Sequence, residues 1–261
     1  MKKLLLLIFI LLTISGVFIY KYKTPEQKSL QSGGIISLMP SNTEILFELG
    51  AKNITAVSNF CNWPPQTKNI KKIGDSFAAD TEAIIAMKPK MVYLNEDARD
   101  LKMRLDNLNI PNHAITNAKS IQDIYDNINL IASLENLNPA PLLLELKNYA
   151  AQKPQHKVKA FVEVDGGLWT IGKESFINDI IEYAGAENIF KDVPTSYFQT
   201  TLEAVLRKTP DIIISIKLKS KEEDFLPQQL RNKKIIRLDP DIYARPAPRV
   251  IRSIPNLKTQ L

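Results

Sequence analysis

Cysteine and histidine are scarce in this chain of 261 residues, which has one cysteine and two histidines. The single Cys61 excludes an internal disulfide, and its position excludes lipid attachment near the N-terminus. It has no histidine nearby, which favours a small loop residue over a nucleophile. His113 and His156 stand in or beside predicted strands with no second ligand at metal-binding spacing. We therefore expect no metal site.

The common catalytic signatures are also missing. The sequence contains no G-x-G-x-x-G, no P-loop and no G-x-S-x-G. The net charge of +6 is modest, and no arginine-rich helix accompanies it. Dispersed lysines are typical of a solvated surface. These absences predict a protein that is not an enzyme, carries no cofactor and has no nucleic-acid partner.

The one long apolar run lies at the N-terminus. Lys2 and Lys3 precede an apolar stretch over residues 4–20, and a polar tether follows to residue 33. This pattern is typical of a secretory signal or a short membrane anchor, with Ser15-Gly16 as a possible cleavage point. In either case we expect the rest of the chain to work outside the cytoplasmic membrane, in the periplasm or an equivalent space. If the segment is uncleaved, it is the contact with the membrane.

Apolar runs and amphipathic helices alternate along the remaining chain, which 44% hydrophobic residues equip for a sizeable core. This alternation predicts an α/β fold with mainly parallel sheets. The expected strands are 35–38, 55–58, 91–94, 112–115, 158–164, 212–216 and 234–238.

Two short patterns occur twice in the same order. Gly50–Ile54 (GAKNI) is matched by Gly185–Ile189 (GAENI), and each follows an amphipathic helix. A helix that begins with Glu82-Ala83 and ends at a proline before an apolar strand returns at Glu203-Ala204. Two matches in one order predict two similar lobes.

The most helical part of the sequence lies between the two copies. Ser120 is expected to cap a helix with apolar residues at spacings of three and four. A break near Pro139 and Pro141 precedes a second helix. We expect an N-terminal lobe over 34–135, a bridging helix over 136–156 and a C-terminal lobe over 157–261.

The stretch SLMPSNTEILFELG, residues 37–50, predicts a strand, a polar loop and a helix. Ser41 and Glu44 have the spacing of a capping box. A helix N-terminus that follows a strand is a common place to bind a small molecule.

Aromatic residues gather in the predicted loops. They are Phe60, Trp63, Phe77, Trp169, Tyr197, Phe198 and Tyr243. Loops beyond the strand ends line the ligand crevice of α/β folds, so these rings predict a broad cleft for a large, partly apolar ligand. Arg245, with Asp241 four residues earlier, would be its polar anchor. Each ring taken alone fits packing against a helix equally well.

The residues 35–254 resemble the substrate-binding proteins of iron-siderophore and vitamin B12 ABC importers. The stretches that carry the resemblance are SLMPSNTEILFELGA, NFCNWPP, EAIIAMKPKMV, GKESFINDIIEYAGAENIFKD, LEAVLRKTPDIII and ARPAPR. They run over nearly the whole chain after the N-terminal segment, and the order is that of the family. The resemblance implies two Rossmann-like lobes bridged by a long backbone helix, the class III periplasmic-binding-protein fold, with the ligand between the lobes.

The resemblance also assigns roles to residues. Ser41, Phe60, Trp169, Tyr197, Asp241 and Arg245 match positions at which vitamin B12-binding members contact their ligand, and Phe77 stands near another such position. Glu82 and Glu203 match the two glutamates with which these proteins dock onto arginines of a paired permease. The expected ligand is a metal chelate: a cobalamin-like corrinoid, a ferric siderophore or haem. A membrane-tethered sensor of the same ligand, or a two-lobed α/β enzyme, are the alternatives.

Overall fold

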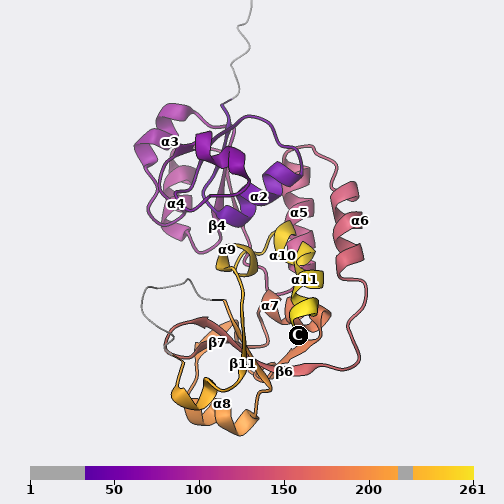
Figure 1. Ribbon diagram of the computed structural model, residues 1–261. Helices are drawn as coiled ribbons and strands as arrows, with labels where there is room; N and C mark the ends of the chain where they lie inside the picture. The colour runs from indigo at the N-terminus through magenta and orange to yellow at the C-terminus, as the bar shows by residue number, and fades with distance from the viewer. Residues whose placement is uncertain (1–32, 217–225) are drawn as a thin grey trace, which may run out of the picture. The chain divides into compact units, whose positions relative to one another are not determined.

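The computed structural model describes residues 33–216 and 226–261, which contain two β-sheets accompanied by helices (Figure 1). The first sheet has the strand order β3-β2-β1-β4-β5, and its strands are all parallel. The second sheet has the order β11-β10-β6-β7-β9, with β8 paired to β6, and combines parallel with antiparallel pairs. The predicted α/β class with two lobes and mainly parallel sheets is confirmed.

The first half of the described chain supplies the first sheet and its helices. Its elements are β1 (Ile35–Ser37), α2 (Pro40–Glu48), β2 (Ile54–Val57), η1 (Pro65–Asn69), β3 (Lys71–Lys72), α3 (Thr81–Met87), β4 (Met91–Asn95), α4 (Arg99–Asn107) and β5 (Asn112–Ile115). Two helices follow, α5 (Ile121–Leu134) and α6 (Ala140–Tyr149). They occupy the stretch for which the sequence predicts a helical connection. The proposed lobe boundaries at 135 and 157 stay a prediction.

The second half supplies the second sheet and a helical C-terminal segment. Its elements are β6 (Val158–Asp165), β7 (Trp169–Ile171), α7 (Phe176–Ala184), β8 (Ala186–Asn188), β9 (Tyr197–Gln199), α8 (Leu202–Lys208), β10 (Ile212–Ser215), η2 (Gln228–Leu230) and β11 (Lys234–Arg237). The segment after β11 contains α9 (Pro240–Tyr243), α10 (Pro248–Arg252) and α11 (Ile254–Gln260).

The N-terminal segment that the sequence assigns to a signal or anchor lies in residues 1–32, outside the described part of the chain. Within the described part, no helix has both the length and the apolar character needed to cross a membrane.

All seven strands expected from the sequence are present within a residue or two of their predicted bounds. Strands β1 and β10 are buried along their whole length, as parallel strands are when both faces of the sheet are covered. The sequence does not predict β3, β7, β8 and β9, because two or three residues are too few for a periodic signal.

The duplicated patterns correspond to matching backbone. Helices α3 and α8 both end on a residue in the left-handed conformation, Lys88 at φ 44° and Thr209 at φ 46°, and a proline follows each. Gly50 and Gly185, which follow α2 and α7, also have positive φ, where glycine carries no steric cost. The repeated sequences therefore form repeated helix ends.

The capping box expected from Ser41 and Glu44 is wrong. Helix α2 begins at Pro40 after Met39, with no side-chain cap, and Ser41 and Glu44 are both buried. At the start of α8 the Thr201 hydroxyl is the cap and accepts from the Ala204 N–H. At α5 the expected cap is present, because Ser120 and Asp123 form a reciprocal capping box.

The hydrophobic core is continuous between the two sheets. Residues 34–261 form one compact unit, and a single cluster of buried side chains includes Tyr93 of the first sheet, Ile128 of α5 and Val162 of the second sheet. The C-terminal segment joins this cluster through Val250 and Leu257. Helix α10 contacts α2 and α6, and α11 contacts α7.

Arg252 links three helices. Its Nη1 and Nη2 donate to the two carboxylate oxygens of Glu48 on α2, at 2.7 and 3.0 Å. Its Nε and Nη2 donate to Glu145 on α6, at 2.7 and 2.9 Å. Two bidentate pairs on one guanidinium fix both distance and orientation.

We predict that Arg252→Ala lowers the free energy of unfolding by about 1.5–3 kcal/mol, the usual range for hydrogen bonds to charged groups. The matched control is Lys102→Ala, which breaks an exposed pair with Asp106 within one helix and should cost about 0.5 kcal/mol or less. Urea unfolding at neutral pH measures both values.

The difference between wild type and Arg252→Ala should close in acid. The hydrogen bond from Arg252 lowers the pKa of Glu145, so the pair stabilises the fold above the ordinary glutamate pKa and is lost as pH falls through the folded value. The difference should narrow as pH falls below the ordinary glutamate pKa of about 4.3 and should vanish once the pH is below the lowered pKa of Glu145. Equal stability at pH 7, or a difference that persists in acid, would contradict this role for Arg252.

Candidate functional site

Loops at the carboxyl ends of β1, β4 and β5 gather at one edge of the first sheet, where parallel α/β sheets place ligands. Ser76 fixes two of these strand ends. Its hydroxyl donates to the Leu38 carbonyl at 3.2 Å and accepts from the Asn95 N–H at 3.2 Å. Ser76 and Asn95 are buried, so the edge of the site is held by hydrogen bonds shielded from water.

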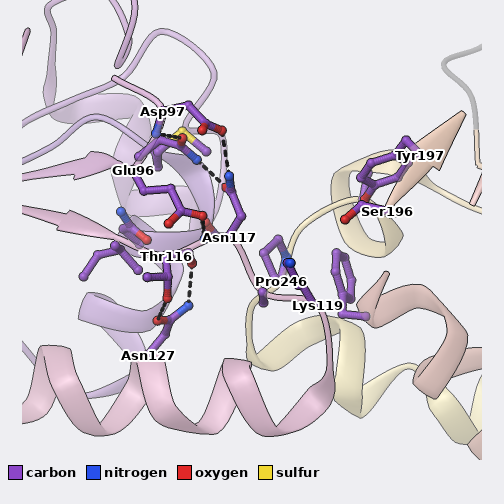
Figure 2. A pocket seen from close by; sticks show the side chains of 17 residues that line it. Glu96, Asp97, Thr116, Asn117, Lys119, Asn127, Ser196, Tyr197 and Pro246 are labelled. Carbon is purple, nitrogen blue, oxygen red and sulfur yellow. Dashed lines mark hydrogen bonds between the residues drawn. The ribbon is translucent and has the colours of Figure 1, made fainter. Parts of the chain in front are cut away.

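An asparagine and carboxylate network follows from this edge. The Asn95 amide donates to Asn117 at 2.7 Å, and the Asn117 amide donates to Asp97 at 2.7 Å. The Asn117 backbone N–H donates to Glu96 at 2.6 Å. Figure 2 shows Glu96, Asp97 and Asn117 together at the wall of a cavity. The network joins the loop after β4 to the loop after β5, so both carboxylates have fixed positions.

Asn127 of α5 supports the same wall from behind. It is buried, its amide donates to the Thr116 carbonyl at 2.9 Å, and its oxygen accepts from the Thr116 hydroxyl at 3.1 Å. The loop after β5 is therefore held to the helix that follows it.

The first cavity has a volume of about 420 Å³. Its lining includes the two loops just described, Ser41 and Asn42 at the start of α2, and Lys119. Phe176, Ser196 and Tyr197 come from the second sheet's half of the chain, and Ala244 and Pro246 come from the C-terminal segment. Figure 2 shows Ser196 and Tyr197 on a different element from the carboxylate wall. Both halves of the chain thus contribute to one cavity.

A second cavity of about 340 Å³ adjoins the first. The two share Met39, Ser41, Ala244 and Pro246. The remaining lining is Leu38, Pro40, Ser58, Phe60, Asp75, Ser76, Phe77, Pro240 and Arg245. Phe60 and Phe77 are 62% and 67% exposed. Each cavity is lined by two aromatic residues, and the first cavity is the more polar.

Glu44 is the buried charge nearest this region. Its side chain is 1% exposed and accepts hydrogen bonds from Arg249 at 2.7 and 2.6 Å and from Arg245 at 3.3 Å. Both arginines lie in the C-terminal segment, about two hundred residues away in sequence. A buried carboxylate is tolerated when charged donors satisfy it in this way. The pairing holds the C-terminal segment against α2.

Arg245 also holds the loop that carries Phe60. It donates to the Asn62 side chain at 2.7 Å and to the Phe60 carbonyl at 3.3 Å, and it forms an ion pair with Asp241. The Asn62 amide in turn donates to Asp241 at 2.7 Å. Nη1 and Nη2 of this guanidinium each donate two hydrogen bonds within the protein, so Arg245 holds the wall of the second cavity in place.

Arg249 lies over the ring of Trp63, in the same loop as Phe60. Its guanidinium carbon is 4.8 Å from the centroid of the Trp63 ring, within the range of a cation–π interaction. The loop 59–64 is thus attached to the C-terminal segment by hydrogen bonds, an ion-pair network and a ring contact.

Trp169 and Tyr197 lie on neighbouring antiparallel strands. Trp169 is opposite Gln199, and Tyr197 is opposite Ile171, so the two rings are diagonal neighbours on one face of the sheet. They are 41% and 45% exposed. Burial at the hydroxyl end raises the pKa of Tyr197, and the hydrogen bond between its hydroxyl and Ser175 opposes that shift.

The residues that the sequence proposes for ligand binding do not all line the same cavity. Ser41 lines both cavities, Tyr197 lines the first, and Phe60, Phe77 and Arg245 line the second. Asp241 reaches the second cavity only through its ion pair with Arg245, and Trp169 lines neither. The assignment of these residues to ligand binding stays a prediction.

The sequence interpretation missed the polar wall of the first cavity. The missed residues are Asn95, Glu96, Asp97, Thr116, Asn117, Lys119 and Asn127. A usable signal was present, since polar residues directly follow the apolar strands 91–94 and 112–115. Carboxyl ends of adjacent parallel strands share one edge of a sheet.

The two glutamates proposed for permease docking lie away from the cavities. Glu82 and Glu203 are exposed residues in the first turns of α3 and α8. Glu203 is 3.5 Å from Arg207 one turn later.

The remaining reactive side chains of the described residues form no metal-binding group. Cys61 is buried with its Sγ 3.1 Å from the Thr43 hydroxyl. His113 is half-buried on β5, and His156 is exposed. Within 33–216 and 226–261, no three His, Cys, Asp or Glu side chains are placed to hold a metal ion.

Comparison with known proteins agrees with this architecture. The periplasmic binding protein family matches residues 35–140. The vitamin B12-binding protein of Salmonella choleraesuis is 30% identical over 231 residues, which cover 83% of this chain and 85% of that protein. An uncharacterised ABC transporter substrate-binding lipoprotein of Bacillus subtilis, YvrC, is 28% identical over 246 residues, 85% of this chain and 78% of that protein.

A solved structure is similar over the same length. A possible iron-binding, periplasmic solute-binding protein of Staphylococcus epidermidis is 29% identical, with a TM-score of 0.74 over 87% of this chain and 98% of that one. Identity and coverage of this extent, together with two sheets whose loops line adjoining cavities, establish the relationship. The chain belongs to the periplasmic binding protein family.

Proposed function

We propose that this chain is the extracytoplasmic substrate-binding protein of an ABC importer, and that it captures a metal chelate and delivers it to a membrane permease. The observation that carries this proposal is the pair of adjoining cavities lined from both halves of the chain. Their volumes lie within the range of small-molecule sites. The relatives named for vitamin B12 binding, ABC transport and iron binding support the same class of function.

The candidate ligands are a cobalamin-like corrinoid, a ferric siderophore and haem. Each is large and either flat or partly apolar, and such ligands are bound by contacts with aromatic rings and by hydrogen bonds at their edges. Phe60, Phe77 and Tyr197 supply rings at the cavities, and Trp169 lies beside Tyr197 on the adjacent strand.

A membrane-tethered sensor of the same ligand is the second candidate. The observation that favours it is the apolar stretch at residues 4–20, which would act as an anchor if it is not cleaved. A sensor needs the ligand site but no permease-docking surface, so uptake separates the two candidates.

The permease contact is proposed for Glu82 and Glu203. They take the same position in two helices of equal length and matching ends. One exposed carboxylate on each lobe would orient a pseudo-symmetric protein on a two-fold permease through arginine–carboxylate pairs. The capping side chains of these helices belong to Asp80 and Thr201, which leaves both glutamates available to a partner.

We predict that Tyr197→Ala weakens the binding of dicyanocobinamide by roughly tenfold or more, because a lost ring contact costs about 0.5–1.5 kcal/mol beyond the lost burial. Quenching of tryptophan fluorescence measures the dissociation constant. Tyr149→Ala is the matched control, since Tyr149 is partly exposed on α6 and lines neither cavity. Equal effects of the two substitutions would contradict the proposed site.

We predict that Glu82→Ala combined with Glu203→Ala abolishes uptake while chelate affinity is unchanged. The loss of helix-dipole interactions should cost only about 0.3–1 kcal/mol per site. Asp100→Ala is the control, because it removes an exposed acid from the first turn of α4. Uptake into proteoliposomes with the cognate permease, beside a thermal melt, decides the matter. Normal uptake by the folded double variant would exclude docking through these residues.

A further inference from the structure

The cations that line the two cavities are already paired with acids. Lys119 donates to Glu174 at 2.8 Å, and Arg245 is engaged by Asp241 and Glu44. A cation that is already paired offers little net attraction to an anionic ligand.

The acids of the polar wall have no such partner. Glu96 and Asp97 line the first cavity and form no ion pair with any residue in the described part of the chain; Asn117 holds both through N–H groups. In the second cavity, Asp75 accepts from the backbone N–H groups of Phe77 and Ala78, at 2.8 and 3.0 Å, and forms no ion pair with another described residue. The wall that meets a ligand is therefore net negative.

The surroundings of Lys119 agree with this charge balance. Its pKa is raised first by the hydrogen bond to Glu174 and further by the charges of Glu96 and Asp123. Three acids thus act on one lysine at the rim of the first cavity.

Each amide of the first cavity uses one of its two N–H donors within the protein. Asn42 donates to the Leu94 carbonyl at 3.2 Å, and Asn95, Asn117 and Asn127 each donate within the wall. The carboxylate oxygens keep acceptor capacity, since an ionised carboxylate has about four lone-pair sites. The wall thus offers a ligand more hydrogen-bond acceptors than donors.

We infer that the site selects a neutral or cationic chelate whose edge carries amide or ammonium N–H donors, and that it rejects polyanionic chelates. This inference rests on the proposed function and narrows its ligand class. Ligands edged with primary amides fit the wall, and neutral hydroxamate chelates are compatible with it. Tris-catecholates and haem bring carboxylate or catecholate charge against Glu96 and Asp97, which like-charge repulsion disfavours.

A matched pair of corrinoids separates charge from size. Dicyanocobinamide carries carboxamides around its ring, whereas dicyanocobyrinic acid has the same ring and metal with carboxylates in their place. Fluorescence titration of the whole chain should give an affinity for the amide compound that is higher by roughly a hundredfold or more. Ferrichrome, which is neutral, should likewise bind with higher affinity than ferric enterobactin and haem, which are anionic.

Two further measurements assign the selectivity to the wall. Raising the salt concentration should reduce the difference in affinity between the two corrinoids, because salt screens repulsion between exposed charges. Glu96→Gln combined with Asp97→Asn should lower the ratio of the two corrinoid affinities by roughly tenfold or more. Asp126→Asn, which removes an acid outside both cavities, should leave it unchanged. The salt series on wild type covers the case in which the double variant is unstable.

The possible outcomes distinguish a failure of this inference from a failure of the proposed binding function. If dicyanocobyrinic acid binds as tightly as dicyanocobinamide, or if haem or ferric enterobactin binds as tightly as ferrichrome, the inference is wrong and the binding function stands. If neither salt nor the double variant changes the difference in affinity between the two corrinoids, the polar wall does not cause that difference and the inference is wrong. If none of the five chelates binds, the proposed function itself fails.

Discussion

The buried carboxylate of Glu44 joins the two ends of the described chain. Arg249 and Arg245 come from the C-terminal segment, and each donates to this side chain of α2. Removing one partner of a buried pair leaves an uncompensated charge, which typically costs about 3–5 kcal/mol. The geometry of the pair thus fixes where the C-terminal segment can lie on the first half of the chain.

The site depends on that position. Ala244 and Pro246, within the segment that Glu44 holds, line both cavities. Arg245 extends the same attachment to the Phe60 loop. Against this fixed wall stands the amide and carboxylate wall of the first sheet, which hydrogen bonds hold independently. A chelate would therefore meet a preformed site, in which little ordering cost opposes binding.

Local patterns predicted the fold well and the site only partly. Apolar runs gave the strands, and the repeated Glu-Ala helices gave two equivalent lobes, because these features depend on neighbours in sequence. The spacing of Glu44 from Ser41 predicts a capping residue, but the actual partners of Glu44 are about two hundred residues away in sequence, where no local pattern reaches. The missed wall around Asn95 and Asn117 likewise depends on which strands are adjacent in the sheet.

The affinity of Glu44→Gln for dicyanocobinamide tests most directly whether the buried pair organises the site. Glu44 lines neither cavity, so a direct contact with the ligand would not explain an effect. In the folded variant, at a temperature well below its melting point, we expect an affinity lower by roughly tenfold or more, since the wall that carries Ala244 and Phe60 loses its attachment. A folded Glu44→Gln protein that binds as tightly as wild type would contradict the account.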